Sequence, residues 1–218
     1  MEDRVNITVL ISGNGSNLQA LIDAAAKGQL NGTITQVISS KPDAYGLTRA
    51  QVANIPTRVH SLTKYYQGTT KEDKEKRKLL RNEFNLELAN ILIHSNPKPH
   101  LVVCAGWMLI LSAPMLDKLE SAGISIINLH PALPKMFDGV NAIERSWNAG
   151  RIGQVEKSGV MIHRVEPIVD GGRVVLIKEL NFIDNESLDD YTTRVHDLEH
   201  IAIVEGTNIV CDEIKSKI

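Results

Sequence analysis

Residues 125–131 read SIINLHP, an almost continuously apolar run that ends in an amide, an imidazole and a proline. Parallel strands that are covered on both faces have this apolar character, and His100–Ala105 shares it. Alternation along a strand places Asn128 and His130 on one side and turns Leu129 away from them. The run therefore predicts a buried parallel strand with two polar side chains at its carboxyl end.

Short apolar runs alternate with helical patterns on both sides of this strand. This alternation predicts a single α/β domain, 1–218, with a doubly wound, mostly parallel, Rossmann-like sheet, which binds ligands at the carboxyl ends of its strands. A charge run at 71–78 predicts a solvated helix face. We expect strands at Val5–Ser12, Ile34–Ser39, Thr57–Leu62, His100–Ala105, Ser125–Leu129 and after Gly172, and helices at Asn17–Lys27, Gly46–Ala53, Lys71–His94 and Ser187–Lys215, the last capped by Ser187 with Asp190.

Bulk composition narrows the class of protein. The 218 residues are 43% hydrophobic and 23% charged, with a formal net charge of −2, which offers no electrostatic attraction to nucleic acid or to an anionic membrane. Cys104 and Cys211 both follow apolar residues, without a C-x-x-C partner, so we expect buried reduced thiols. The N-terminal residues lack a signal-peptide pattern. A soluble cytoplasmic protein is expected, and its oligomeric state is not indicated.

The polar strand end has an acidic counterpart at 169–172, which read VDGG. Asn128 can donate to a developing oxyanion, His130 can shuttle a proton, and a nearby Asp170 would raise the pKa of the imidazole. These groups would suit acyl transfer. Alternatively, Asn128 and His130 simply end a strand that Pro131 stops.

A second candidate site lies at 11–17, which read ISGNGSN between the first strand and the first helix. Its glycines, its exposed amides and the helix N-terminus would cradle an anion such as a phosphomonoester. Leu18 occupies the third glycine position of the dinucleotide fingerprint, and the Gly-Lys-Ser/Thr of a P-loop is missing, so NAD and ATP are not favoured. The alternative is a tight turn without a ligand.

The motifs together resemble those of the phosphoribosylglycinamide formyltransferases, a folate-dependent formyltransferase family. They are ISGNGSNLQALID at 11–23, CAGWMLIL at 104–111, INLHPALP at 127–134, VDGG at 169–172 and RVHDLEH at 194–200. The resemblance runs from Val5 to about Ile209. It implies transfer of a formyl group from 10-formyltetrahydrofolate to the amine of glycinamide ribonucleotide (GAR), a step of purine synthesis that uses small-molecule substrates and no metal.

The resemblance also implies residue roles, with GAR in the N-terminal half and folate and catalysis in the C-terminal half. The catalytic residues would be Asn128, His130 and Asp170. GAR would contact Gly15, Ser16, Asn17, His163, His196, Asp197, Leu198 and Glu199. The folate donor would contact Arg81, Met108, Leu109, Ile110, Leu111, Asn128, Glu166, Pro167, Ile168, Val169 and Asp170.

Three positions depart from the family pattern. HPALP is one residue shorter than the usual HPSLLP, so the loop that follows must take another route. Leu109 stands where the family often has Arg, and Met161 replaces the serine two residues before His163. These changes affect substrate contacts and leave the catalytic trio intact.

Other functions remain open. Residues 196–200 spell H-x-x-E-H, a zinc-protease signature, although no third ligand is evident, and a helix facing GAR explains the same residues. A formyltetrahydrofolate hydrolase would use the same trio on water and would not need the phosphate loop. A methionyl-tRNA formyltransferase generally has a further RNA-binding domain and a basic surface. A catalytically silent ligand-binding module on this fold is the remaining alternative.

Overall fold

The computed structural model describes residues 4–217, so residues 1–3 and 218 of the predicted domain lie outside it. The described residues form one seven-stranded sheet in the order β3-β2-β1-β4-β5-β6-β7. Strands β1 to β5 pair in parallel, whereas β6 and β7 are antiparallel to their neighbours. The strands are β1 (Val5–Ile11), β2 (Gly32–Ser39), β3 (Thr57–Val59), β4 (Leu101–Cys104), β5 (Ser125–His130), β6 (Lys157–Arg164) and β7 (Val174–Asn181). The doubly wound, mostly parallel fold is confirmed.

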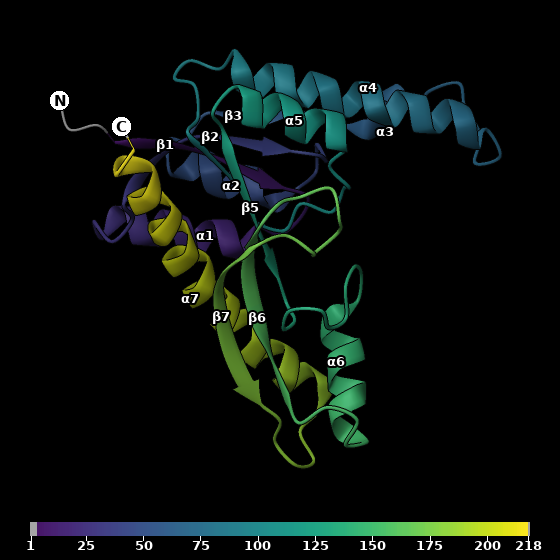
Figure 1. The fold of residues 1–218 in the computed structure, drawn as a ribbon, viewed down its shortest axis with the longest axis vertical. Coiled ribbons are helices and arrows are strands. Elements are labelled where there is room, and N and C mark those ends of the chain that lie inside the picture. The colour runs from purple at the N-terminus through teal and green to yellow at the C-terminus, as the bar shows by residue number, and fades with distance from the viewer. Residues whose placement is uncertain (1–3, 218) are drawn as a thin grey trace.

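Helices cover both faces of the sheet (Figure 1). They are α1 (Ser16–Ala26), α2 (Tyr45–Val52), α3 (Leu62–Tyr65), α4 (Lys74–Ile93), α5 (Ala113–Ser121), α6 (Ala142–Arg151) and α7 (Leu188–Lys215). The predicted cap of α7 is confirmed, because the Ser187 hydroxyl accepts a hydrogen bond of 3.1 Å from the Asp190 amide.

Two hydrophobic clusters lie on opposite faces of the sheet. Val9 and Val103 join the cluster under α1 and α7, while their neighbours Leu10 and Val102 join the cluster under α4 and α5. Successive strand residues point to opposite faces, so covering both faces requires the continuous apolar runs seen in the sequence. Both cysteines are buried and unpaired, as expected.

The sequence prediction was incomplete where local patterns are weak. The predicted strand Thr57–Leu62 ends at Val59, because the chain turns and α3 begins at Leu62. Helix α6 was missed since its buried face carries small residues rather than an apolar stripe. Strand β6 was missed as well. Its Gly159 permits a close approach of β7, since a Cβ there would lie 2.2 Å from the Lys178 carbonyl oxygen.

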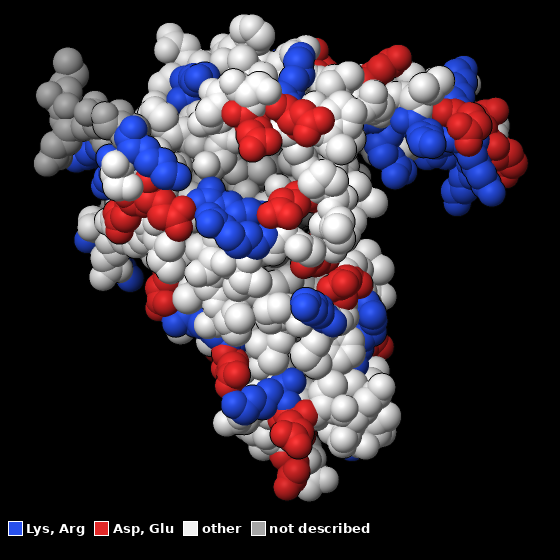
Figure 2. Space-filling model, in the orientation of Figure 1, with Lys and Arg blue, Asp and Glu red and all other residues white. Residues whose placement is uncertain are grey.

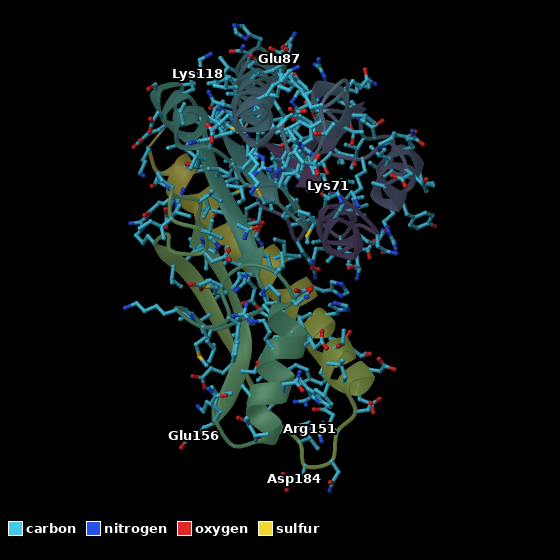
Figure 3. All side chains as sticks on the ribbon, turned by 90° about the vertical axis from the view of Figure 1, so that its right-hand side faces the viewer. Lys71, Glu87, Lys118, Arg151, Glu156 and Asp184 are labelled. Carbon is cyan, nitrogen blue, oxygen red and sulfur yellow. The ribbon has the colours of Figure 1, made fainter. Side chains whose placement is uncertain are left out.

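The antiparallel strands extend the molecule away from its parallel half (Figure 1). Strands β6 and β7 run beside α6 and the first half of α7, and Figure 3 shows Arg151, Glu156 and Asp184 at this end. Glu87 and Lys118 lie at the opposite end. The 28-residue α7 packs on β6, β7 and α1 and so joins the two halves.

The start of α4 and the segment before it form an arm that projects from the sheet (Figure 1). Lys and Arg gather on this arm in Figure 2, and most residues of the predicted charge run 71–78 are exposed, as expected for a solvated face. Over residues 4–217, no helix combines the length and the apolar character needed to cross a bilayer.

Candidate functional site

The candidate site is a cleft of about 860 Å³ at the carboxyl ends of the parallel strands. Strand order reverses between β1 and β4, and such a switch point opens a crevice for ligands. The Ser12 hydroxyl ties the loops after these strands together, because it accepts a bond of 2.9 Å from the Met108 amide. The phosphate-loop candidate and the folate-segment candidate therefore form adjacent walls of one cleft.

Most of the predicted site residues line this cleft. They come from the loops after β1 and β4, from the ends of β5 and β6, from the loop between β6 and β7, and from α7. The lining includes Gly15, Ser16, Asn17, Met108, Leu109, Ile110, Leu111, Asn128, His130, His163, Glu166, Pro167, Ile168, Val169, Asp170, His196 and Glu199.

Three predicted residues lie outside the cleft lining. Arg81 sits on the arm, where its Nε donates a bond of 3.0 Å to the Tyr66 hydroxyl. On α7, only one side of the helix faces the cleft, so Asp197 is exposed and Leu198 packs against the core. The side chains of Arg81, Asp197 and Leu198 are therefore not part of this lining, and their ligand contacts stay predictions.

Asp170 lies at the centre of the catalytic candidates. Its Oδ2 is 3.4 Å from Nδ1 of His130, and its Oδ1 is 3.4 Å from Nε2 of His163. Oδ2 also accepts a bond of 2.9 Å from the Gly139 amide, which the shortened loop after Pro134 brings to the site. Asp170 has a φ of +53°, a left-handed conformation that Asp tolerates better than most residues. The carboxylate thus holds two imidazoles and a loop in place.

Register between β5 and β6 places the remaining polar groups. Asn128 pairs with His163, and the Asn128 amide nitrogen lies 3.3 Å from Nε2 of His163. Nδ1 of His163 is 2.8 Å from the Arg164 carbonyl oxygen, which fixes a proton on that nitrogen because a carbonyl only accepts. Met161, which departs from the family pattern, is fully buried opposite His130. Sequence reasoning placed His163 beside the substrate but missed this strand and hence these contacts.

The pKa of His130 is lower than its ordinary value. Burial lowers this pKa more than the charge of Asp170 raises it, so the predicted net increase is wrong. Burial also raises the pKa of Asp170, but the adjacent His163 side chain, the bond from the Gly139 amide and the charge of His130 outweigh burial and leave it below its ordinary value. The pair is therefore a neutral imidazole beside an ionised carboxylate near neutral pH.

Nε2 of His130 is available for chemistry. This nitrogen is buried and has no hydrogen-bond partner among residues 4–217, although His130 lines the cleft. Buried polar atoms are nearly always hydrogen-bonded, and an exception in a cleft needs an explanation. With Nδ1 turned to Asp170, Nε2 is the atom that can exchange a proton with a ligand.

The glycine-rich loop is tightly held from behind. Gly15 has a φ of +75°, and a Cβ there would lie 2.7 Å from Cα of Gly46 on α2. Arg49 donates to the Asn14 carbonyl at 2.9 Å and to the Asn14 side-chain oxygen at 3.0 Å. By contrast, nothing lies within 4 Å of a Cβ built on Gly13. The loop is therefore a tight turn, as one of the two sequence interpretations has it. The turn also places the N-terminus of α1 at the cleft, and a helix N-terminus favours the binding of an anion.

Glu199 is the buried acid of the α7 wall. Its carboxylate accepts a bond of 3.1 Å from the Asn17 side chain, and burial raises its pKa to about 7 against the lowering effect of that bond. The H-x-x-E-H pattern does not form a metal cluster here. Within residues 4–217, no three His, Cys, Asp or Glu side chains gather in a way that could hold a metal ion.

Exposed apolar side chains border the cleft beside the catalytic candidates. Met108, Ile110, Ile168 and Val169 are all exposed, and Met108 retains 68% of its accessible surface. Apolar walls with a few polar groups are typical of small-molecule sites, so these residues fit a ligand with an apolar or aromatic part.

Sequence reasoning missed several lining residues. Lys41 follows β2 and could have been found, because β2 neighbours β1 and its carboxyl end must open on the same edge. The others lie on loops, on helix α6, which the sequence did not predict, and on the first turns of α7, whose orientation toward the cleft the sequence does not give. They include Trp107, Gly139, Val140, Asn141, Glu144, Leu188 and Thr192.

Comparisons with known proteins agree with the site. A family model described as formyl transferase matches residues 5–207. The phosphoribosylglycinamide formyltransferase of Saccharomyces cerevisiae is 49% identical over 216 residues, which cover 95% of this chain and 98% of that protein. The enzyme of the same name from Dictyostelium discoideum is 45% identical over 207 residues, covering 94% and 97% of the two chains.

Solved structures show the same fold. The crystal structure of glycinamide ribonucleotide transformylase 1 from Symbiobacterium toebii has a TM-score of 0.82 and 29% identity, and the match covers 98% of this chain and 90% of that one. The phosphoribosylglycinamide formyltransferase structure from Coxiella burnetii has a TM-score of 0.80 and 34% identity over 97% and 89% of the two chains.

Proposed function

Because this chain belongs to the formyl transferase family, we propose that its cleft moves a formyl group from 10-formyltetrahydrofolate to the amine of GAR. The chain is an enzyme of purine biosynthesis, and GAR transformylation is its activity. The identity of the donor and the roles of individual residues are the parts that we propose. The observation that carries them is the free Nε2 of His130 with Asp170 behind Nδ1.

The two substrates occupy opposite walls of the cleft in this proposal. Gly15, Ser16 and Asn17 bind the GAR phosphate, with His163, His196 and Glu199 on the same substrate. The donor lies along Met108–Leu111 and Glu166–Asp170, where apolar side chains are exposed. The reacting atoms then meet near His130 and Asn128, between the two walls.

Neutral His130 acts as a general base and then as a general acid. When the GAR amine adds to the formyl carbon, Nε2 of His130 takes the proton that the amine nitrogen loses. Asn128 donates to the formyl oxygen, which gains negative charge as the new C–N bond forms. The imidazolium then gives its proton to the folate nitrogen as the bond from that nitrogen to the formyl carbon breaks. Asp170 stabilises the imidazolium between the two transfers.

The remaining properties are proposals as well. The enzyme works in the cytoplasm on small molecules, with neither nucleic acid nor membrane as a partner and without a metal ion. The net charge of −2 and the two buried thiols support this view. The N-terminal half supplies the phosphate loop of the GAR site, and the C-terminal half supplies the other GAR contacts, most of the folate contacts and the catalytic residues.

An absorbance assay tests the proposal directly. The purified protein is mixed with 10-formyltetrahydrofolate, and the deformylated folate is followed with and without GAR. We expect product only when GAR is present. Product formed at the same rate without GAR would indicate a hydrolase, and no product under either condition would indicate a silent ligand-binding module.

A further inference from the structure

The charged residues of the cleft include one lysine whose role is not yet assigned. Among the Lys and Arg side chains of residues 4–217, only Lys41 lines the cleft, although Lys and Arg gather on the arm (Figure 2). Four acidic residues share the lining: Glu144, Glu166, Asp170 and Glu199, and burial leaves Glu199 partly protonated near neutral pH because it raises the pKa to about 7. Both proposed substrates are anions, so Coulomb repulsion would oppose their binding unless a cation compensated for it.

Lys41 lies directly beside the glycine-rich loop. The preceding residue, Ser40, donates from its hydroxyl to the Ser12 hydroxyl at 2.7 Å and from its amide to the Ile11 carbonyl at 3.0 Å. Ser12 in turn is the residue that leads into Gly13. The loops after β1 and β2 are thus joined side by side at the edge where the phosphate is expected.

The backbone of Lys41 is fixed, whereas its ammonium is free. The buried hydroxyl of Ser39 accepts a bond of 3.1 Å from the Lys41 amide and donates one of 2.7 Å to the Lys41 carbonyl. No ion pair or side-chain hydrogen bond within residues 4–217 includes the Lys41 ammonium. A fixed backbone with a free charged group suits a residue that meets a ligand.

We infer that Lys41 binds the phosphate of the acceptor substrate as the ammonium that complements Gly13–Asn17. This inference rests on the proposed function, because GAR supplies the phosphate. A phosphomonoester carries nearly two negative charges near neutral pH, whereas a helix N-terminus offers only about half of one positive charge. A Cβ built on Gly13 would meet nothing within 4 Å, and Gly13 and Lys41 line the same cleft, so no protein atom fills the space beside Gly13.

Arg49 does not fill this role. Its guanidinium donates to the carbonyl and the side chain of Asn14 and, at 3.1 Å, to the Gln19 side chain. These bonds hold the outer side of the loop, and Arg49 is not part of the cleft lining. Arg49 therefore supports the loop, and Lys41 provides the free donor.

The test compares Lys41→Met with Lys27→Met. Lys27 is exposed at the end of α1, so the control removes the same charge far from the carboxyl ends of the strands. We expect Lys41→Met to raise KM for GAR by roughly 10- to 100-fold, the worth of a lost charge-assisted hydrogen bond. In the same variant, KM for the donor and kcat should each change by less than about twofold. Lys41→Arg keeps a positive charge and should therefore restore much of the affinity for GAR.

A second readout does not depend on formyl transfer. Ribose 5-phosphate should bind the native protein and the Lys27→Met variant alike in calorimetry, and Lys41→Met should bind it roughly 10-fold more weakly or worse. This result would support Lys41 even if the assay for GAR failed. An unchanged affinity of Lys41→Met for ribose 5-phosphate would overturn the inference. A rise in KM for the donor alone would also overturn it, and would indicate that the Lys41 ammonium binds a carboxylate of the donor instead.

Discussion

The imidazole of His130 and the carboxylate of Asp170 face each other at 3.4 Å between Nδ1 and Oδ2. Burial nevertheless leaves the pKa of His130 below its ordinary value, since desolvation of the imidazolium outweighs this attraction. Asp170 therefore has two effects. It orients Nε2 toward the cleft, and it limits the loss of basicity that burial causes.

Replacing Asp170 with Asn should lower the pKa of His130 further, because the favourable charge is removed. A neutral base is inactive when protonated, so the acidic limb of the pH profile of kcat/KM should move to lower pH. We expect kcat to fall by ~10²–10⁴, and His130→Ala should cost a similar factor. NMR titration of His130 measures the pKa, and steady-state kinetics measures the rate.

Asp138→Asn is the matched control for this change. Asp138 is exposed in the same loop region and contributes the weakest of the influences on His130. Its variant should leave both the titration of His130 and kcat nearly unchanged. If Asp170→Asn behaved like Asp138→Asn, Asp170 would be a turn residue without a role in proton transfer.

Continuous apolar runs made the sheet predictable, and the rule that such sheets bind ligands at the carboxyl ends of their strands then indicated where the cleft lies. Asn128 and His130 could be placed together because a strand has a fixed period of two residues. The same reasoning could not give the direction of the pKa shift of His130. That shift depends on how deeply other segments bury the ring, and the contacts of His163 and Gly139 that complete the Asp170 site come from segments without a strong local pattern.

Arg81 shows a second limit of the sequence. A short match to a family motif gave its position in the chain, whereas the structure ties its guanidinium to Tyr66 on the arm. The sequence around Tyr66 has no motif or periodicity that predicts this contact. Side chains on long exposed helices depend on such local partners, so their ligand contacts cannot be inferred from spacing.

Gly15 and Gly13 should respond differently to alanine. Gly15→Ala places a Cβ against Gly46 and forces a left-handed φ on a residue with a side chain, so we expect a loss of ~1–3 kcal/mol in the free energy of unfolding. Gly13→Ala meets open space and should change stability by less than about 1 kcal/mol. Urea unfolding at neutral pH measures both variants.

The kinetics of Gly15→Ala test whether the position of the loop matters for GAR binding. The Cβ of Gly15→Ala points at α2 rather than into the cleft, so it should raise KM for GAR by moving the loop, with a smaller effect on KM for the donor. Equal weakening of both substrates would mean that the loop only supports the fold.

Metal analysis tests the H-x-x-E-H alternative. Because Glu199 is bonded to Asn17 and His200 is not part of the cleft lining, we expect no stoichiometric zinc in the purified protein. Activity should also survive treatment with a chelator. One tightly bound zinc per chain, with activity lost on its removal, would support a metallohydrolase instead.

Glu199 should make the stability of the enzyme depend on pH. Its pKa rises from 4.5 to about 7 on folding, so the folded state holds this proton more tightly than the unfolded state. The resulting stabilisation is fully present below the unfolded pKa and is lost as pH rises through about 7. Glu199→Gln keeps the shape and an acceptor for Asn17 but cannot ionise. Its free energy of unfolding, relative to the native protein, should therefore increase by about 3 kcal/mol between pH 4.5 and pH 8.

Urea unfolding across this pH range measures the difference, with Asp197→Asn as the control. Asp197 is an exposed carboxylate two residues before Glu199 on the same helix, so water screens its charge. The curve for Asp197→Asn should stay close to that of the native protein, apart from a small difference where His200 titrates, because the charge of Asp197 raises the pKa of His200. The curve for Glu199→Gln should diverge from that of the native protein above about pH 5. If the curve for Glu199→Gln ran parallel to that of the native protein, the pKa of Glu199 would not change on folding, and its carboxylate would be ionised at neutral pH.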